Sequence, residues 1–199
     1  MGLDLMYFDG QTPLSEDEKE GLLIPSISTR SELDEFEQQN IEEAILWSLK
    51  RKFSSTFLFT EDFICELHKR MYGNVWDWAG EFRKTNKNIG VDKWQIPTDL
   101  KILLGDVIYW NKNNIFSADE TVIRFKHRLV SIHCFPNGNG RHSRLLADII
   151  IEQFFKLPHF TWGSSQLSAS NNVRERYLYA LKTADKGNIV PLINFARST

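Results

Sequence analysis

The chain has 199 residues, of which 42% are hydrophobic and 25% charged, and its formal net charge is −2. This length suits one compact domain, and the apolar content excludes an intrinsically disordered chain. The small negative charge offers no basic field for a nucleic-acid backbone, no run is long enough to span a membrane, and two cysteines without metal-ligand spacing favour a reducing cytoplasm.

The first half of the chain predicts a leader followed by two helices. Residues 1–28 are polar and contain two prolines, so we expect a leader that packs on the core of a single domain formed by residues 29–199. Thr29 with Glu32 has the pattern of a capping box and opens a helix whose apolar stripe extends to Leu49. A second helix is predicted from Thr60 to Gly73.

The remaining elements are a loop and further helices. Helical spacing is lost from Trp76 to Pro97, where glycines and asparagines interrupt, and this segment predicts a loop with a short hairpin. Further helices are expected from about Thr98, from Ser117 to about Ile132, from Arg141 to before Pro158, and from Asn172 to Gly187. The fold class is therefore predicted to be all-α.

A glycine-rich turn separates two of these helices and has the pattern of an anion site. Gly138 and Gly140 alternate with Asn137 and Asn139 just before the helix that begins near Arg141. Glycines let backbone amides point toward one place, and the free amides of a helix start attract anions. This turn predicts a phosphate-binding loop.

Two arginines and one histidine flank that loop. Arg141 and Arg144 are spaced by three and share one helix face, so their guanidinium groups suit a di- or triphosphate. His133 precedes the loop, where a neutral imidazole can take a proton from a hydroxyl beside a bound phosphate. Phe135 lies between base and loop, and we expect its buried ring to fix the geometry of the loop.

Each feature alone has an ordinary structural explanation. A histidine at a helix end is usually structural, a Gly-Asn-Gly run is usually a turn, and arginines at this spacing are usually solvated. Their combination within twelve residues favours a nucleotide site. His68, His127, His142 and His159 are interpreted as structural, with His142 facing solvent or the edge of a ligand.

The run HCFPNGNGRHSR from His133 to Arg144 closely resembles the signature of Fic proteins, H-x-F-x-[D/E]-[G/A]-N-G-R-x-x-R. The segment at Leu67-His68, the block from Trp78 to Arg83 and the helix after Tyr177 also resemble Fic sequences, in the style of the subgroup called mobile mystery protein B. The resemblance implies an all-α Fic domain over residues 29–199 with a β-hairpin flap over its active site.

The family resemblance also implies an activity and its residues. Most characterised Fic proteins transfer AMP from ATP to a Ser, Thr or Tyr hydroxyl of a target protein. By resemblance His133 is the catalytic base, Asn139 and the loop amides hold the α-phosphate, and Arg141 and Arg144 hold the β- and γ-phosphates. The nucleotide-binding set is expected to comprise Asn137, Gly138, Asn139, Gly140, Arg141 and Arg144.

One position departs from the family signature. The acidic residue that helps to hold Mg²⁺ in relatives is Asn137 in this chain, and a neutral amide offers a hard cation an oxygen without charge. We expect weaker metal affinity, with Mg²⁺ bound through the oxygens of the nucleotide and assisted by Asn137.

Two regulatory features follow from the resemblance. The target-docking flap is expected to include Lys84, Thr85, Asn86, Lys87, Asn88, Ile89 and Gly90, by strand addition to the target, although an ordinary exposed loop is an alternative. Many relatives inhibit themselves with a glutamate that pairs with the second arginine of the signature. Here Glu20 is the candidate partner of Arg144, and a solvated surface glutamate is the alternative.

The leading hypothesis is thus a bacterial cytoplasmic protein adenylyltransferase that uses ATP and Mg²⁺. Three alternatives remain: a phosphotransferase like the Doc toxin, which carries Lys where this chain has Gly140; a regulatory nucleotide-binding module; and a helical interaction protein. Expected partners are a protein substrate and, as open cases, a separate inhibitor or regulator protein and a second copy of the chain, but neither nucleic acid nor membrane.

Overall fold

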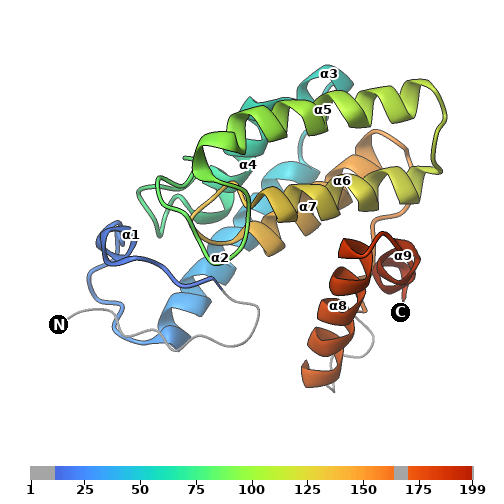
Figure 1. Ribbon diagram of the computed structural model, residues 1–199. Helices are drawn as coiled ribbons and strands as arrows, with labels where there is room; N and C mark the ends of the chain where they lie inside the picture. The colour runs from blue at the N-terminus through green and yellow to red at the C-terminus, as the bar shows by residue number, and fades with distance from the viewer. Residues whose placement is uncertain (1–11, 164–169, 199) are drawn as a thin grey trace.

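The structure, a computed structural model, describes residues 12–163 and 170–198, and its described part is built from helices connected by loops (Figure 1). No strand occurs in these ranges, which confirms the all-α prediction. The helices are α1 (Glu16–Glu20), α2 (Arg30–Leu49), α3 (Ser55–Leu58), α4 (Glu61–Tyr72), the 3-10 turn η1 (Lys93–Gln95), α5 (Ile96–Lys112), α6 (Ala118–Ile132), α7 (Asn139–Gln153), α8 (Ser170–Asp185) and α9 (Val190–Arg197).

The predicted helix starts at Thr29, Thr60 and Ser117 are confirmed. The Thr29 hydroxyl accepts from the Glu32 amide while the Glu32 carboxylate accepts from the Thr29 amide, so the capping box is complete. Thr60 and Ser117 each accept one first-turn amide, from Phe63 in α4 and from Glu120 in α6. These caps satisfy amides that have no partner within the helix.

Three helices were not predicted, for reasons of length and pattern. The short α1 and α3 carry too few residues for periodicity, although Ser15 and Glu18 form a capping box at α1. The C-terminal α9 begins with Pro191 in its first turn. The start of α7 also lies at Asn139, before the predicted Arg141, because Gly138 already supplies the carbonyl for the first helical bond.

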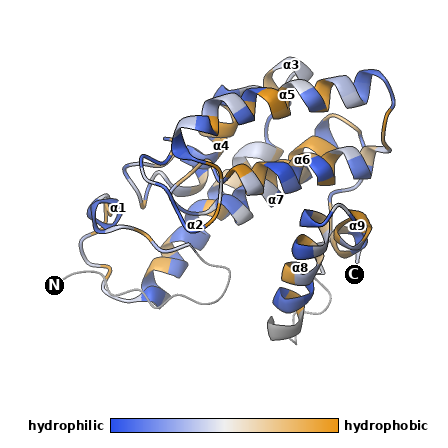
Figure 2. Cartoon of the chain, in the orientation of Figure 1, coloured by the Kyte–Doolittle hydropathy of each residue, from blue (hydrophilic) through white to orange (hydrophobic). Residues whose placement is uncertain are grey.

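The core lies between paired helices. Helix α6 packs against α5 on one side and α7 on the other, α2 packs against α4, and α8 packs against α9 (Figure 1). Large side chains such as Trp76, Phe125 and Phe135 are fully buried in it. Polar residues alternate with the apolar stripes of the helices (Figure 2), and over the described ranges no helix is both long and apolar enough to cross a membrane.

The short hairpin predicted between Trp76 and Pro97 is wrong. In the part of the chain that the structure describes, residues 84–92 form an irregular loop that leads into η1. The side chain of Arg83 donates to the carbonyls of Thr85 and Val91, one near each end of this loop. These carbonyls therefore bond to a guanidinium and not to a facing strand, and the loop closes without a ladder.

Candidate functional site

The site is built on the turn between α6 and α7. Helix α6 ends where His133 adopts a left-handed conformation, with φ 59° and ψ 61°, and α7 begins after Gly138, with φ 77°. A left-handed conformation costs a residue with a side chain about 1 kcal/mol or more, so other contacts must hold His133 in place. Gly90 supports this turn because a Cβ atom at that position would lie 2.7 Å from the Cβ of His133.

Arg83 fixes the turn through hydrogen bonds to its backbone carbonyls. Its backbone amide donates to the carbonyl of Cys134 (2.9 Å), and its Nε donates to the carbonyl of His133 (2.7 Å). Arg83 as a residue is 3% exposed, and its guanidinium also reaches both ends of the loop at residues 84–92. One buried arginine thus ties the left-handed histidine to the loop that lies over it.

The start of α7 presents free backbone amides. The first helical bond runs from the His142 amide to the Gly138 carbonyl (2.9 Å), and no side chain caps this helix. The amides of Asn139, Gly140 and Arg141 precede that bond and have no acceptor within the helix. Together with the positive end of the helix dipole they form a site for an anion.

The two asparagines of the loop act on its backbone. Asn139 is buried, and its amide group both accepts from the Phe135 amide (3.0 Å) and donates to the Phe135 carbonyl (2.8 Å). The side chain of Asn139 therefore braces the loop, and its backbone amide is the group it offers at the start of α7, so its role at the α-phosphate stays a prediction. The Asn137 oxygen accepts from the Gly138 amide (2.7 Å).

His68 on α4 fixes the loop from the core side. Its Nδ1 accepts from the Gly80 amide (3.0 Å), so Nε2 carries the proton and donates to the Asn137 carbonyl (3.1 Å). Its ring stacks on the buried ring of Phe135 at 3.7 Å between centroids. Burial, reinforced by the neighbouring His142 and Arg141, keeps the pKa of His68 well below its usual range, which preserves this neutral tautomer.

His133 is held as a neutral base. It is 5% exposed, and its Nε2 lies 3.2 Å from the hydroxyl oxygen of Thr12. Burial, with the positive charges of Arg83 and Lys87, lowers the pKa of His133 to about 4. The imidazole is therefore unprotonated at neutral pH and ready to accept a proton.

Both signature arginines line one cavity, but their side chains contact different residues. Arg141 pairs with the buried carboxylate of Glu37 (2.6 Å), and Arg144 lies over the ring of Tyr177 (5.5 Å). The cavity measures about 490 Å³, in the size range of small-ligand sites. Its lining includes His133, the loop residues Asn137 to Gly140, both arginines, Thr12, Arg30, Asp34 and residues of α8.

The phenol of Tyr177 lines the cavity, and a buried lysine lies behind it. The ammonium of Lys126 is completely buried and donates to the Tyr177 hydroxyl. Burial alone would raise the pKa of Tyr177, but the positive charges of Lys126 and Arg144 lower it below its ordinary value. The site is thus positively charged on this side as well, which favours an anionic ligand.

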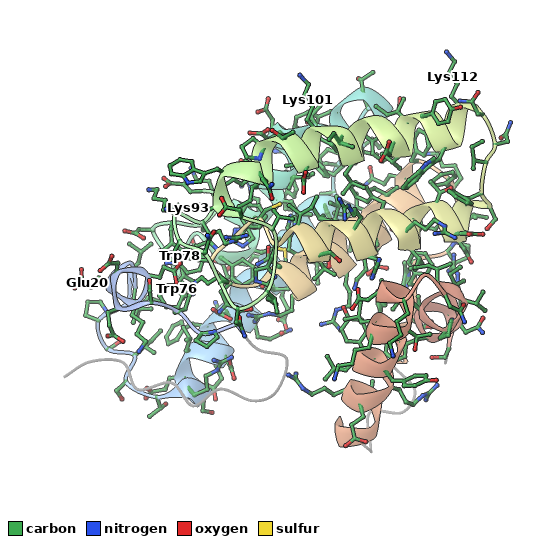
Figure 3. The ribbon with its side chains drawn as sticks, in the orientation of Figure 1. Glu20, Trp76, Trp78, Lys93, Lys101 and Lys112 are labelled. Atoms are coloured by element: carbon green, nitrogen blue, oxygen red, sulfur yellow. The ribbon has the colours of Figure 1, made fainter. Side chains whose placement is uncertain are left out.

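Glu20 does not reach Arg144, which corrects the predicted inhibitory pair. Glu20 is exposed at the end of α1, and Figure 3 shows it at the outer edge of that helix, away from α7. The carboxylate that contacts a signature arginine belongs to Glu37 of α2, which is 1% exposed and also accepts from the indole of Trp76 (2.8 Å). It pairs with the first arginine, Arg141, and not with the second.

The described residues do not provide a Mg²⁺ site of their own. No group of three or more potential metal ligands occurs in residues 12–163 and 170–198. The only loop side chain at the metal position is the neutral amide of Asn137, whose oxygen already accepts from Gly138. A neutral amide oxygen offers a hard dication no charge, so the protein contributes little to holding it.

Several site residues were missed by sequence reasoning. His68 and Arg83 lie in segments that resemble Fic sequences, at Leu67-His68 and in the block ending at Arg83, and this was the signal for them. Glu37 is one of many glutamates on α2 and carries no distinguishing signal. His142, expected near solvent or ligand, is buried and bonds through Nε2 to the Ile64 carbonyl (3.0 Å).

An imidazole beside the free amides of a helix start and two guanidiniums is an arrangement that can bind a phosphate group next to a proton acceptor. Comparisons identify the family: residues 58–151 match the family model described as Fic/DOC family. The sequence is 31% identical over 137 residues to the protein adenylyltransferase Fic of Drosophila grimshawi and 29% identical over 136 residues to that of Aedes aegypti. Each alignment covers 66% of this chain and 26% of the relative, so the chain spans about a quarter of their length.

Solved structures show the same fold. The BepC protein of Bartonella tribocorum, with bound AMPPNP, has a TM-score of 0.64 at 18% identity, covering 90% of this chain and 95% of that one. Fic-1 from C. elegans has a TM-score of 0.60 at 22% identity, covering 89% of this chain and 51% of the other. The chain therefore carries a domain of the Fic/DOC family, while its likeness to the mobile mystery protein B subgroup stays a prediction.

Proposed function

We propose that this chain is a protein adenylyltransferase, which transfers AMP from ATP to a Ser, Thr or Tyr hydroxyl of a protein. The observation that carries the proposal is the single cavity shared by His133, the loop amides and both signature arginines. The curated relatives from Drosophila and Aedes are named protein adenylyltransferases, which supports the same activity.

Three sets of groups would have separate roles in AMP transfer: the loop amides, the two arginines and His133. The amides of Asn139, Gly140 and Arg141 receive the α-phosphate at the start of α7, and Arg141 and Arg144 receive the β- and γ-phosphates. Neutral His133 removes the proton from the attacking hydroxyl. The oxygen attacks the α-phosphorus, and pyrophosphate leaves with the bonding electrons.

Gly140 favours transfer of AMP over transfer of the γ-phosphoryl group. A Cβ atom built at Gly140 meets nothing within 4 Å, so the space beside the loop is open for phosphates. A lysine here, as in the Doc-like branch, would place its side chain in that space. We therefore propose the orientation in which the α-phosphate faces His133.

Mg²⁺ is proposed to be carried by the oxygens of the nucleotide, assisted by Asn137. Asn137→Asp adds the missing charge, and we expect it to lower the Mg²⁺ concentration for half-maximal AMP transfer roughly tenfold. Measuring AMP transfer against Mg²⁺ concentration for both proteins tests this. Equal, metal-independent rates would remove the metal role.

The wider assignment follows from the same proposal. Residues 29–199 would act as one Fic domain with residues 1–28 as leader, in the bacterial cytoplasm, where the free thiols of Cys65 and Cys134 stay reduced. The loop at residues 84–92 would contact the target protein. A homodimer and a separate regulator protein remain predictions.

The experiment is transfer of label from ATP to protein. The chain is incubated with a cell lysate and ATP labelled at either the α- or the γ-phosphate, beside His133→Ala. We expect α-label on protein, lost by roughly 100-fold or more without the base. γ-Label instead would favour the phosphotransferase.

A regulatory nucleotide-binding module is the second candidate. It is favoured by the occupied oxygen of Asn137 and by the ion pair that holds Arg141. Nucleotide binding by calorimetry without transfer of either label would identify it. No nucleotide binding at all would leave only a helical interaction protein.

A further inference from the structure

A threonine of this chain occupies the position next to the base. The hydroxyl oxygen of Thr12 lies 3.2 Å from Nε2 of His133, and within the described ranges that nitrogen has no other hydrogen-bond partner. Thr12 is 7% exposed and lines the same cavity as the loop amides and both signature arginines. A hydroxyl within hydrogen-bond reach of a general base, beside an anion site, has the position of an acceptor substrate.

The segment around Thr12 is fixed by the loop expected to dock a target. Glu18 accepts from the Thr85 hydroxyl (3.0 Å) and forms an ion pair with Lys87, whose side chain is 5% exposed. Lys87 also donates to the Pro13 carbonyl (3.1 Å), directly after Thr12. The surface that would position a target thus positions residues 12–18 of this chain.

A second set of contacts anchors the same segment on the core. The indole of Trp78 donates to the Glu18 carbonyl (2.9 Å), and Leu14 is 5% exposed in the hydrophobic core. Thr12 is therefore held from its C-terminal side by a backbone contact, a buried ion pair and apolar packing. Such preorganisation favours a reaction within the molecule over one between molecules.

We propose that Thr12 is a modification site of this enzyme: its hydroxyl accepts AMP from ATP bound in the adjacent cavity. The inference rests on the proposed adenylyltransferase function and names an acceptor for it. The occupant of the target position is then a segment of the chain itself, and an external protein must displace residues 12–18 to reach His133.

The step balances with ATP as the co-reactant. A bond forms between the Thr12 oxygen and the α-phosphorus, and the bond from that phosphorus to the bridging oxygen of the β-phosphate breaks. The hydroxyl proton goes to Nε2 of His133, and pyrophosphate leaves with the electron pair. The product is a phosphodiester between AMP and Thr12.

The test uses the whole chain with α-labelled ATP and Mg²⁺, alone and with lysate proteins, and maps the modified residue by mass spectrometry. It is run on the native chain and on Glu37→Gln, which removes the charge paired with Arg141. Thr12→Val removes the acceptor hydroxyl, Thr12→Ser restores one, and Thr56→Val removes an exposed threonine hydroxyl on α3 as the matched control.

We expect AMP on residue 12 in the native chain, in Thr12→Ser and in Thr56→Val, and none on residue 12 in Thr12→Val. His133→Ala should lower the label roughly 100-fold or more, and the fraction modified per unit time should not change on dilution of the protein. Label confined to other residues or to lysate proteins overturns the inference and leaves the proposed function standing. If neither the native chain nor Glu37→Gln places label on any protein, both the inference about Thr12 and the proposed adenylyltransferase function are overturned.

Discussion

Arg83 is predicted to be the positioning residue of the base. Its guanidinium holds the carbonyl of His133 at 2.7 Å and that of Thr85 at 2.8 Å, and it also reaches Val91, while only 3% of the residue is exposed. Arg83→Lys keeps the positive charge but replaces a planar fork by a single ammonium. Lysine cannot direct donors to three carbonyls in this geometry.

The expected cost follows from the hydrogen bonds that are lost. A hydrogen bond from a charged donor contributes roughly 1.5–3 kcal/mol, so losing one to two of them lowers the free energy of unfolding by about 3 kcal/mol. For a chain of this size this corresponds to a fall in Tm of roughly 6–12 °C. The released His133 also loses its left-handed restraint, and a displacement of the base by about 1 Å costs roughly 100-fold in kcat.

Two assays separate these effects. Thermal unfolding measures the fall in Tm, and transfer of α-labelled AMP measures kcat and the KM for ATP, with KM expected to change little because Arg83 does not line the cavity. Arg128→Lys is the matched control, since Arg128 lies on α6 with a side chain that is 56% exposed. If Arg83→Lys and Arg128→Lys melt at the same temperature, the hydrogen bonds from Arg83 to the carbonyls around His133 do not stabilise the fold as described.

Three further predictions concern the cavity and the core. Glu37→Gln frees Arg141 from its buried carboxylate, so ATP should bind roughly tenfold tighter, or about 1.4 kcal/mol, and unchanged affinity by calorimetry would show that the pair does not compete with phosphate. Burial lowers the pKa of His142 from 6.5 to about 4, so the unfolded chain binds the proton more readily and stability falls as pH drops below 6.5. Urea unfolding at pH 7 and pH 5 should show about 2 kcal/mol less pH dependence in His142→Phe than in the native chain, and equal dependence would contradict this. Gly138→Ala places a Cβ atom 2.5 Å from the ring of Tyr72 at a φ of 77°, so we expect roughly 1–3 kcal/mol of destabilisation by urea unfolding together with weaker ATP binding; a native midpoint would refute the strain.

The helix starts could be predicted because their causes are local. Thr29, Thr60 and Ser117 each satisfy amides within the first turn of their own helix, and this depends only on residues two or three positions ahead. The same holds for the turn of glycines before α7, where backbone freedom and free amides are properties of a few consecutive residues. The short α1 and α3 were missed because periodicity needs more residues than they have.

The partners of the site residues could not be predicted, because they come from distant segments. Among the glutamates of the first half of the chain, Glu37 reaches Arg141 and Glu20 does not, and this choice follows from the packing of α2 near the indole of Trp76. The loop at residues 84–92 was predicted as a hairpin from its glycines and asparagines. Its form depends instead on a buried guanidinium that contacts both of its ends.

By itself the sequence determined the helical class and the glycine turn before α7, because helix caps, apolar spacing and a turn with free amides are properties of neighbouring residues. The tertiary structure alone decided that Thr12 lies at the base, that Glu37 holds Arg141 and that His68 and Arg83 support the turn. These contacts join residues far apart along the chain, and only the packing of whole helices brings such residues within hydrogen-bond distance.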